Sequence, residues 1–194
     1  NGYSSSGSTV WRLDAKGNVL SRNAFDNERG SWDMTAVPGL EIVDLSSDGC
    51  QQAIIGRKNA YNEVALHHAV TGDRRWLRLL GDWISALATL DVNADGVQEI
   101  IVGSPSAWLT AFDFSGAQLW AVQLPHEIRA MHALGQRLLV ACTDRSVYEV
   151  GVDGSLLARC VLKGMPLSSF AGHADTVTIA DDAGGVTCFQ VSAP

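Results

Sequence analysis

The sequence predicts an all-β protein, a β-propeller built from four-stranded antiparallel blades. Short apolar runs typical of strands recur along the chain and are separated by turns rich in glycine and aspartate. The same landmarks return every 40 to 47 residues; Asp48-Gly49 and Asp95-Gly96, for example, are 96 − 49 = 47 residues apart. This is the spacing of propeller blades. One four-stranded sheet cannot bury both faces alone, so successive blades stack and each covers its neighbour.

The repeat divides a single propeller segment, residues 1–194, into blade units. These are a partial blade at 9–26, three full blades at 40–81, 82–125 and 126–164, and a partial blade at 165–194. We therefore expect a partial propeller, an open arc of about three full blades that remaining blades or another chain would close. A four-bladed ring is the alternative closure, and a β-sandwich is the runner-up architecture. The chain begins at Asn1 rather than Met, so we also expect that a leader or an upstream part of a longer protein precedes it.

Composition narrows the class of partner. A hydrophobic content of 46% is ample for a buried core, and the formal net charge of −7 argues against a nucleic-acid partner. The only local basic group, Arg74, Arg75 and Arg78, is interpreted as a solvated strand edge. No apolar run approaches the roughly 20 residues that a spanning helix needs, so no membrane span is expected.

The four cysteines, Cys50, Cys142, Cys160 and Cys188, form no C-x-x-C pair, so neither a zinc knot nor a redox dithiol is indicated. Three of them lie inside apolar runs, where a thiol usually serves as a small hydrophobic group. Free thiols are favoured over a disulfide.

The loop at the start of the second full blade predicts a cation site. Its pattern, D-x-N-x-D-G-x-x-E, places oxygen side chains at alternating positions, and Gly96 permits the chain to reverse. Calcium prefers several hard oxygen ligands arranged in this way. A strand-like run follows and the last carboxylate comes at the ninth position, so the loop is not an EF-hand. The expected calcium ligands are Asp91, Asn93, Asp95, the backbone carbonyl of Val97, and Glu99. The alternative is a solvated turn held by Asp hydrogen bonds.

An earlier copy of this loop predicts a weaker second site. It offers Asp44, Ser46, Asp48 and Gln52, with two carboxylates instead of three, so its affinity for calcium should be lower. A plain turn held by Asp and Ser hydrogen bonds is an equal alternative here.

Two family resemblances cover nearly the whole chain from Thr9. Residues 66–76 and 111–120 resemble the quinoprotein-like (PQQ-like) propeller repeat, A-x-D-x-x-T-G-x-x-x-W. In that family the tryptophan docks between blades, which implies a structural role for Trp76 and Trp120. His68 stands where the aspartate is expected, and the third blade has Ala158 in the tryptophan position.

The acidic loop resembles the calcium loop of FG-GAP or VCBS repeats. These repeats occur in integrin-like propellers and in many secreted bacterial proteins, so the resemblance implies an extracellular or periplasmic location. Propellers of this superfamily serve as adhesion modules, enzyme scaffolds and accessory domains.

The histidines do not form an evident catalytic group. His67 and His68 should point to opposite faces of a strand and so cannot chelate one metal together. His126, His132 and His173 could line a propeller face, but no nucleophile or carboxylate lies beside them in sequence. No hydrolase, zinc-protease, P-loop or dinucleotide motif is present.

We therefore predict a non-catalytic, calcium-stabilised propeller segment that binds a carbohydrate or protein partner or acts as a scaffold. One alternative is the propeller part of an extracellular carbohydrate-active enzyme such as a polysaccharide lyase. A quinone-dependent dehydrogenase is less favoured, because the adjacent cysteine pair found in many such enzymes is missing.

Overall fold

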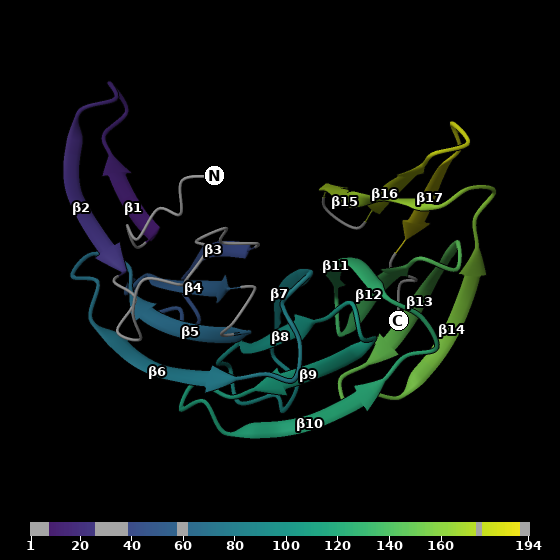
Figure 1. Ribbon diagram of the computed structural model, residues 1–194, viewed down its shortest axis with the longest axis horizontal. Helices are drawn as coiled ribbons and strands as arrows, with labels where there is room; N and C mark the ends of the chain where they lie inside the picture. The colour runs from purple at the N-terminus through teal and green to yellow at the C-terminus, as the bar shows by residue number, and fades with distance from the viewer. Residues whose placement is uncertain (1–7, 26–38, 58–61, 174–175, 191–194) are drawn as a thin grey trace, which may run out of the picture. The chain divides into compact units, whose positions relative to one another are not determined.

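The computed structural model describes residues 8–25, 39–57, 62–173 and 176–190. These residues form strands and turns, and no helix occurs among them. They belong to two compact units, residues 1–84 and residues 85–194, whose strands are labelled in Figure 1. The predicted all-β fold class is confirmed.

The first unit contains two antiparallel sheets. One is two-stranded, with β1 (Ser8–Leu13) beside β2 (Val19–Phe25). The other is four-stranded, and each strand pairs with the next along the chain: β3 (Gly39–Val43), β4 (Gln52–Arg57), β5 (Glu63–His68) and β6 (Arg74–Leu79).

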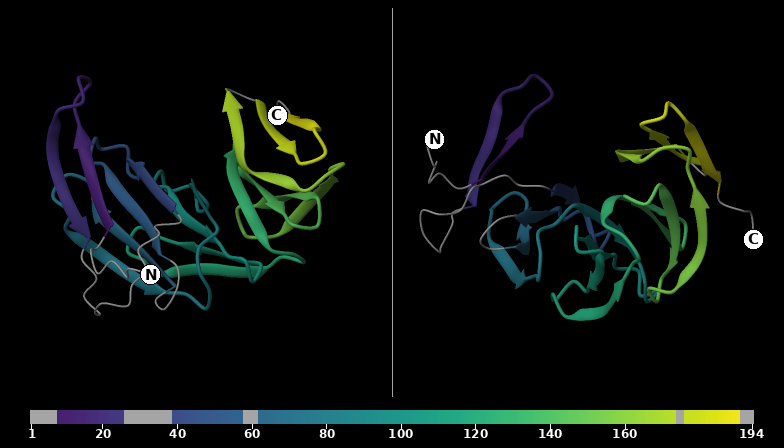
Figure 2. Two further views of the ribbon diagram at one scale, coloured as in Figure 1. Left: turned by 45° about the horizontal axis from the view of Figure 1, so that its top comes forward. Right: turned by 45° about the vertical axis from the view of Figure 1, so that its right-hand side comes forward.

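The second unit contains three antiparallel sheets, coloured teal, green and yellow in Figures 1 and 2. The first comprises β7 (Ala86–Leu90), β8 (Glu99–Gly103), β9 (Trp108–Phe112) and β10 (Gln118–Gln123). The second comprises β11 (Ile128–Leu134), β12 (Arg137–Cys142), β13 (Ser146–Gly151) and β14 (Leu156–Val161). The third comprises β15 (Pro166–His173), β16 (Thr176–Asp181) and β17 (Val186–Gln190).

The sheets have the strand order of propeller blades. In each sheet the strands follow in chain order, and β11 packs beside both β7 and β15, so the first strands of successive sheets are neighbours in the second unit. The described residues thus form three four-stranded sheets, one two-stranded sheet and one three-stranded sheet. This agrees with the predicted partial propeller of about three full blades. Residue 26, where the first predicted unit ends, and residues 191–194 lie outside the described residues.

Apolar side chains hold successive blades of the second unit together. Ile101 and Leu109 of one sheet share a buried cluster with Leu138 and Val140 of the next. Full burial of such a side chain stabilises the fold by about 1.5–3 kcal/mol. The sheets approach closely at Gly103, where a Cβ atom would lie 2.7 Å from the Ile128 side chain. A larger residue at 103 would therefore separate the two blades.

Trp120 connects the same two blades. Its indole Nε1–H donates a hydrogen bond of 2.9 Å to the carbonyl oxygen of Val152 in the turn between β13 and β14. Its ring lies against Gly154, where a Cβ atom would come within 3.2 Å of the ring. The docking role that the family resemblance implies is therefore confirmed for Trp120. Trp76 is buried, with the Arg78 guanidinium carbon 5.7 Å from its ring centroid.

Candidate metal centre

The loop of the predicted calcium site joins β7 to β8 and is held by backbone hydrogen bonds to Asp91. The chain reverses with a positive φ of 63° at Ala94 and 86° at Gly96. The N–H groups of Ala94 and Gly96 then donate to Asp91 Oδ1 at 2.7 Å and Oδ2 at 3.0 Å. Both oxygens of this carboxylate therefore face into the loop.

The other three predicted side-chain ligands belong to the same network. Asn93 Oδ1 accepts from the N–H of Asp95 at 2.9 Å, and Asp95 Oδ1 accepts from the N–H of Val97 at 2.7 Å. The carboxylate of Glu99 accepts from the N–H of Val92 at 2.8 Å and from Asn93 Nδ2 at 3.2 Å. The loop thus consists of short-range turns closed by side-chain hydrogen bonds, and Glu99 accepts two of these bonds at its base.

Glu99 is the buried member of the loop, with an exposed fraction of 1%. Burial raises the pKa of its carboxyl above the ordinary value. The charges of Asp95, Asp91 and Asp113 raise it further, while the hydrogen bond from Val92 opposes them. Asp113 lies in the turn that follows β9 and was not among the predicted site residues. The pairing of β9 with β8 brings it near Glu99, a relationship that spacing along the chain does not reveal.

The loop between β3 and β4 has the same geometry 47 residues earlier. Gly49 N–H donates to Asp44 Oδ2 at 2.7 Å, and Cys50 N–H donates to Asp48 Oδ1 at 2.7 Å. Gln52 takes the place of Glu99 and accepts the N–H of Leu45 at 3.0 Å. A neutral amide therefore supports the same loop conformation.

Ser46 takes the place of Asn93 in this earlier loop. Its hydroxyl oxygen is buried and has no hydrogen-bond partner among the described residues. A buried hydroxyl without a partner costs about 1–3 kcal/mol. This oxygen therefore has spare capacity to bind a ligand.

The two loops supply oxygen ligands of the kind that calcium binds, although their carboxylates accept hydrogen bonds from backbone N–H groups. Among the described residues, no three His, Cys, Asp or Glu side chains lie together in an arrangement that would hold a metal. A carboxylate oxygen has two lone pairs, however, so an oxygen that accepts one N–H can also bind a cation. The later loop offers three carboxylates and an amide oxygen, which are hard ligands of the kind that calcium prefers.

His67 and His68 lie at the end of β5, where His68 pairs with Gln52 at the base of the earlier loop. His67 is buried and its Nδ1 lies 3.0 Å from the carbonyl oxygen of Gly72. The Nδ1 atom of His68 accepts from the N–H groups of Val70 and Thr71 at 3.3 and 3.1 Å. His132 is half-buried, and burial lowers its pKa. The side chain of His173 lies outside the described residues.

The four cysteines are free thiols, as expected, and Cys188 is exposed rather than buried. Burial together with the Asp144 charge raises the pKa of Cys142 to about 12.

A polar cluster around Asp144 was not among the predicted sites. Asp144 is its centre, in contact with His126, Tyr148 and Arg159. The cluster joins side chains 33 residues apart, from 126 to 159, and only the pairing of strands brings them together.

Comparison with known proteins supports the fold. No family model matches the chain, and no curated protein matches it. Among solved structures, BBS1N in complex with ARL6DN has a TM-score of 0.73 at 14% identity, over 95% of this chain and 55% of that chain. BamB from Moraxella catarrhalis, a PQQ-like β-propeller, has a TM-score of 0.58 at 20% identity, over 78% of this chain and 45% of that chain. The computationally designed Ika4 protein has a TM-score of 0.67 at 12% identity, over 84% of this chain and 95% of that chain.

The chain thus spans about half the length of the two natural propellers that it resembles. At these identities the likeness concerns the fold alone. No helix in the described ranges is long and apolar enough to cross a membrane. The strand order, the docking of Trp120 and these structural neighbours together establish that this chain has the fold of a β-propeller.

Proposed function

We propose that this chain is a non-catalytic propeller segment that binds one calcium ion in the loop from Asp91 to Glu99 and serves as a binding or scaffold module. The observation that carries the proposal is the accumulation of negative charge around Glu99. Asp91, Asp95 and Asp113 all raise the pKa of this buried carboxyl. A bound calcium ion would compensate that charge, so folding of the loop should be linked to binding of the metal.

The ligands in this proposal are Asp91, Asn93, Asp95, the Val97 carbonyl and Glu99. Calcium would supply charge compensation and rigidity to the loop, because it accepts six to eight oxygen ligands in a flexible geometry. Magnesium should substitute poorly, since it requires a tighter octahedral shell. Asp44, Ser46, Asp48 and Gln52 form the weaker second site, supported by the buried, unpartnered hydroxyl of Ser46.

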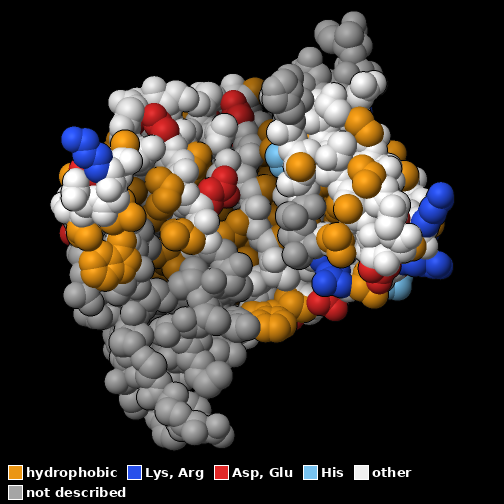
Figure 3. Space-filling model, turned by 90° about the horizontal axis from the view of Figure 1, so that it is seen from above, with side chains coloured by type: hydrophobic (Ala, Val, Ile, Leu, Met, Phe, Trp, Pro, Cys, Tyr) orange, Lys and Arg blue, Asp and Glu red, His pale blue; other side chains and the backbone are white. Residues whose placement is uncertain are grey.

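The proposed partner is a carbohydrate or another protein. One of the similar propellers was crystallised in complex with another protein, which supports a binding role for this fold. Lys and Arg side chains are scattered over the face shown in Figure 3 and form no single patch among the described residues. This distribution and the net charge of −7 support a partner other than nucleic acid. We further propose an extracellular or periplasmic location, because the acidic loop resembles the calcium loop of FG-GAP or VCBS repeats, which occur in many secreted bacterial proteins.

A thermal melt in calcium and in chelator tests the calcium proposal. Wild type should melt at a higher temperature in calcium, and Asp95→Ala should lose most of that gain. Asp48→Ala should lose less, because its loop has only two carboxylates. Equal melting temperatures of wild type in the two buffers, with no calcium detected by elemental analysis, would leave both loops as ordinary acidic turns.

An activity assay tests the non-catalytic role. The 194-residue chain should neither depolymerise acidic or neutral polysaccharides nor oxidise alcohols when calcium and quinone are supplied. Product formation that is abolished by replacing His126, His132 or His173 would instead favour the lyase or dehydrogenase alternatives.

A further inference from the structure

A second polar site lies around Asp144, in the turn between β12 and β13. The side chain of Asp144 is 8% exposed. Its Oδ2 atom accepts hydrogen bonds from the Tyr148 hydroxyl at 2.8 Å and from Arg159 Nη2 at 3.0 Å, and His126 Nε2 lies 3.9 Å away. Burial alone would raise the pKa of Asp144, but the hydroxyls of Tyr148 and Ser146 and the charges of His126 and Arg159 lower it. Asp144 is therefore a buried carboxylate held in its charged form.

The second oxygen of this carboxylate is unused. Oδ1 of Asp144 is buried and makes no hydrogen bond within the described residues. A buried polar atom without a partner costs about 1–3 kcal/mol, and more when the group is charged. Oδ1 can therefore accept a hydrogen bond from a further donor.

The side chains over Asp144 are donors held in place. Arg159 Nε donates to Ser146 Oγ at 2.8 Å, and the guanidinium carbon lies 5.6 Å from the centroid of the Tyr148 ring. These contacts fix the guanidinium plane, yet the side chain is 51% exposed. His126 is similarly exposed, at 53%. Both can therefore meet a ligand from solvent.

This cluster is not a structural requirement of a blade. Tyr148 pairs with Arg159 across β13 and β14, one position past Ala158, which takes the place of Trp120. At the same position the preceding blade pairs Thr110 with Ala121. The first four-stranded sheet pairs Ala65 with Leu77 there. A group needed to build the sheet would recur in these blades, whereas the Asp–Tyr–Arg combination occurs only in the blade from β11 to β14 among the described sheets.

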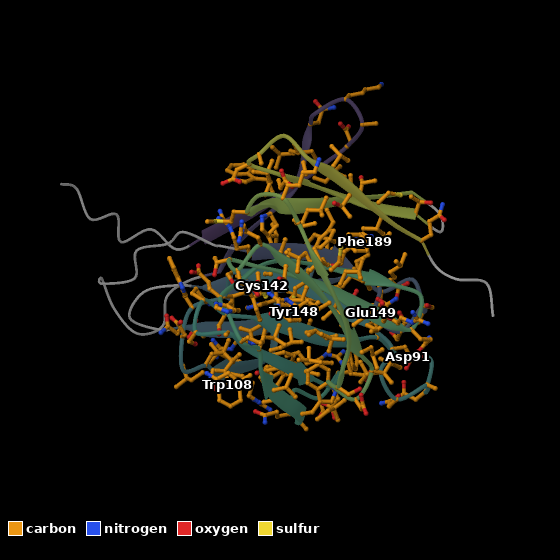
Figure 4. The ribbon with its side chains drawn as sticks, turned by 90° about the vertical axis from the view of Figure 1, so that its right-hand side faces the viewer. Asp91, Trp108, Cys142, Tyr148, Glu149 and Phe189 are labelled. Atoms are coloured by element: carbon orange, nitrogen blue, oxygen red, sulfur yellow. The ribbon has the colours of Figure 1, made fainter. Side chains whose placement is uncertain are left out.

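The position of the cluster separates it from the calcium loop. Asp144 lies in the turn between β12 and β13, which is equivalent to the turn before Trp108 between β8 and β9, whereas Asp91 lies in the loop at the opposite end of β8. In Figure 4, Asp91 lies to the right, and Cys142 and Trp108 lie to the left of it. The two sites therefore offer independent surfaces.

We propose that the Asp144 cluster binds a hydroxyl group of a neutral sugar. The ligand must donate to Asp144 Oδ1 and accept from Arg159 or His126. A hydroxyl does both, whereas an anion such as acetate or sulfate lacks the donor, and an ammonium group lacks the acceptor and is repelled by Arg159. The inference rests on the binding role proposed above and assigns carbohydrate, rather than protein, as its ligand class.

The test is saturation-transfer NMR on the whole chain with glucose, galactose, mannose, xylose and glycerol, and with acetate and sulfate as anionic probes. At least one neutral sugar should bind with a dissociation constant of at most tens of millimolar. Asp144→Asn should weaken that binding at least ten-fold, because an amide nitrogen replaces one acceptor oxygen. Asp153→Asn, in the exposed turn at the other end of β13, is the matched control and should bind as wild type does.

Further variants separate a binding effect from a folding effect. Arg159→Gln and His126→Ala change half-exposed side chains, and each should weaken sugar binding without altering the circular dichroism spectrum. Absence of binding by every sugar, tighter binding of acetate or sulfate than of any sugar, or sugar binding that survives all three substitutions would each overturn the inference.

A chelator separates this inference from the calcium proposal. Sugar binding should persist in chelator. Sugar binding without a calcium-dependent melt would refute the calcium proposal alone, and a calcium-dependent melt without sugar binding would refute the Asp144 site alone.

Discussion

Glu99 and Gln52 accept the same hydrogen bond in two copies of one loop. Each side chain lies at the base of its loop, is nearly fully buried, and accepts the backbone N–H of the residue seven positions earlier, Val92 at 2.8 Å and Leu45 at 3.0 Å. The hydrogen bond therefore needs an acceptor but no charge. The additional charge of Glu99 is a cost to the loop unless a cation compensates it.

The first prediction concerns the pH dependence that Glu99 imposes. Burial and the neighbouring aspartates raise its pKa above the ordinary value of 4.5. In the pH range between the ordinary and the raised pKa, the folded chain holds more protons than the unfolded chain, so the free energy of unfolding falls as pH rises. In chelator, Glu99→Gln should therefore gain stability relative to wild type as the pH rises from below 4.5 to neutral.

Urea unfolding at a series of pH values measures this effect, and Glu127→Gln, which removes an exposed glutamate, is the matched control. A Glu99→Gln variant that loses stability relative to wild type over the same range would show that the charge of Glu99 is already compensated within the chain.

A second prediction concerns the docking of Trp120 against Gly154. Gly154 has a φ of +81°, and a Cβ there would lie 2.9 Å from Val122 and 3.2 Å from Trp120. Gly184 has a φ of +78° with no atom within 4 Å of the same position. Alanine at either site incurs the left-handed backbone cost of about 1–2 kcal/mol, but only Gly154→Ala also disturbs the blade contact.

We expect Gly154→Ala to destabilise the chain by about 1–3 kcal/mol more than Gly184→Ala. The midpoints of chemical unfolding give the difference. Equal losses in the two variants would mean that the docking of Trp120 tolerates a displaced turn.

A third prediction concerns His68, which replaces the aspartate of the family repeat. Its Nδ1 accepts hydrogen bonds from two backbone N–H groups in the turn after β5. In the next blade, Oδ1 of Asp113 accepts hydrogen bonds from the N–H groups of Ser115 and Ala117, both at 2.8 Å. His68→Ala removes this acceptor and should cost about 0.5–1.5 kcal/mol. His68→Asp restores an acceptor of the family type and should be at least as stable as wild type. A His68→Ala variant as stable as His68→Asp would show that the turn needs no side-chain acceptor.

The fold could be predicted from the sequence because its signals are local and repeated. The turn glycines with positive φ, Gly49 and Gly96, lie in equivalent loops, and Trp120 follows its turn glycine at the family spacing. Each four-stranded sheet is built from strands that follow one another in the chain, so the repeat length was enough to place these sheets.

The environment of the loop could be predicted only in part. Its ligand types and the glycine reversal are local features. The approach of Asp113 to Glu99 depends on the pairing of β8 with β9, and it adds a charge that the loop motif does not contain. The Asp144 cluster was missed for the same reason, because Arg159 reaches Tyr148 through the register of two strands rather than through a motif.

The most direct test of the calcium proposal exchanges the residues at the base of the two loops. Glu99→Gln and Gln52→Glu each preserve an acceptor for the loop N–H and change only its charge. Calcium titration calorimetry, combined with melts in calcium and in chelator, compares wild type with both variants. At calcium concentrations 100 times the dissociation constant, one site contributes about 2.7 kcal/mol, which corresponds to a rise of about 5–10 °C in melting temperature.

We expect that wild type binds calcium and shows this rise, and that Glu99→Gln loses most of it. We also expect that Gln52→Glu binds calcium more tightly in the earlier loop and melts higher in calcium than wild type. A wild type that binds no calcium, or a calcium-dependent change in melting temperature that neither exchange alters, would contradict the calcium proposal.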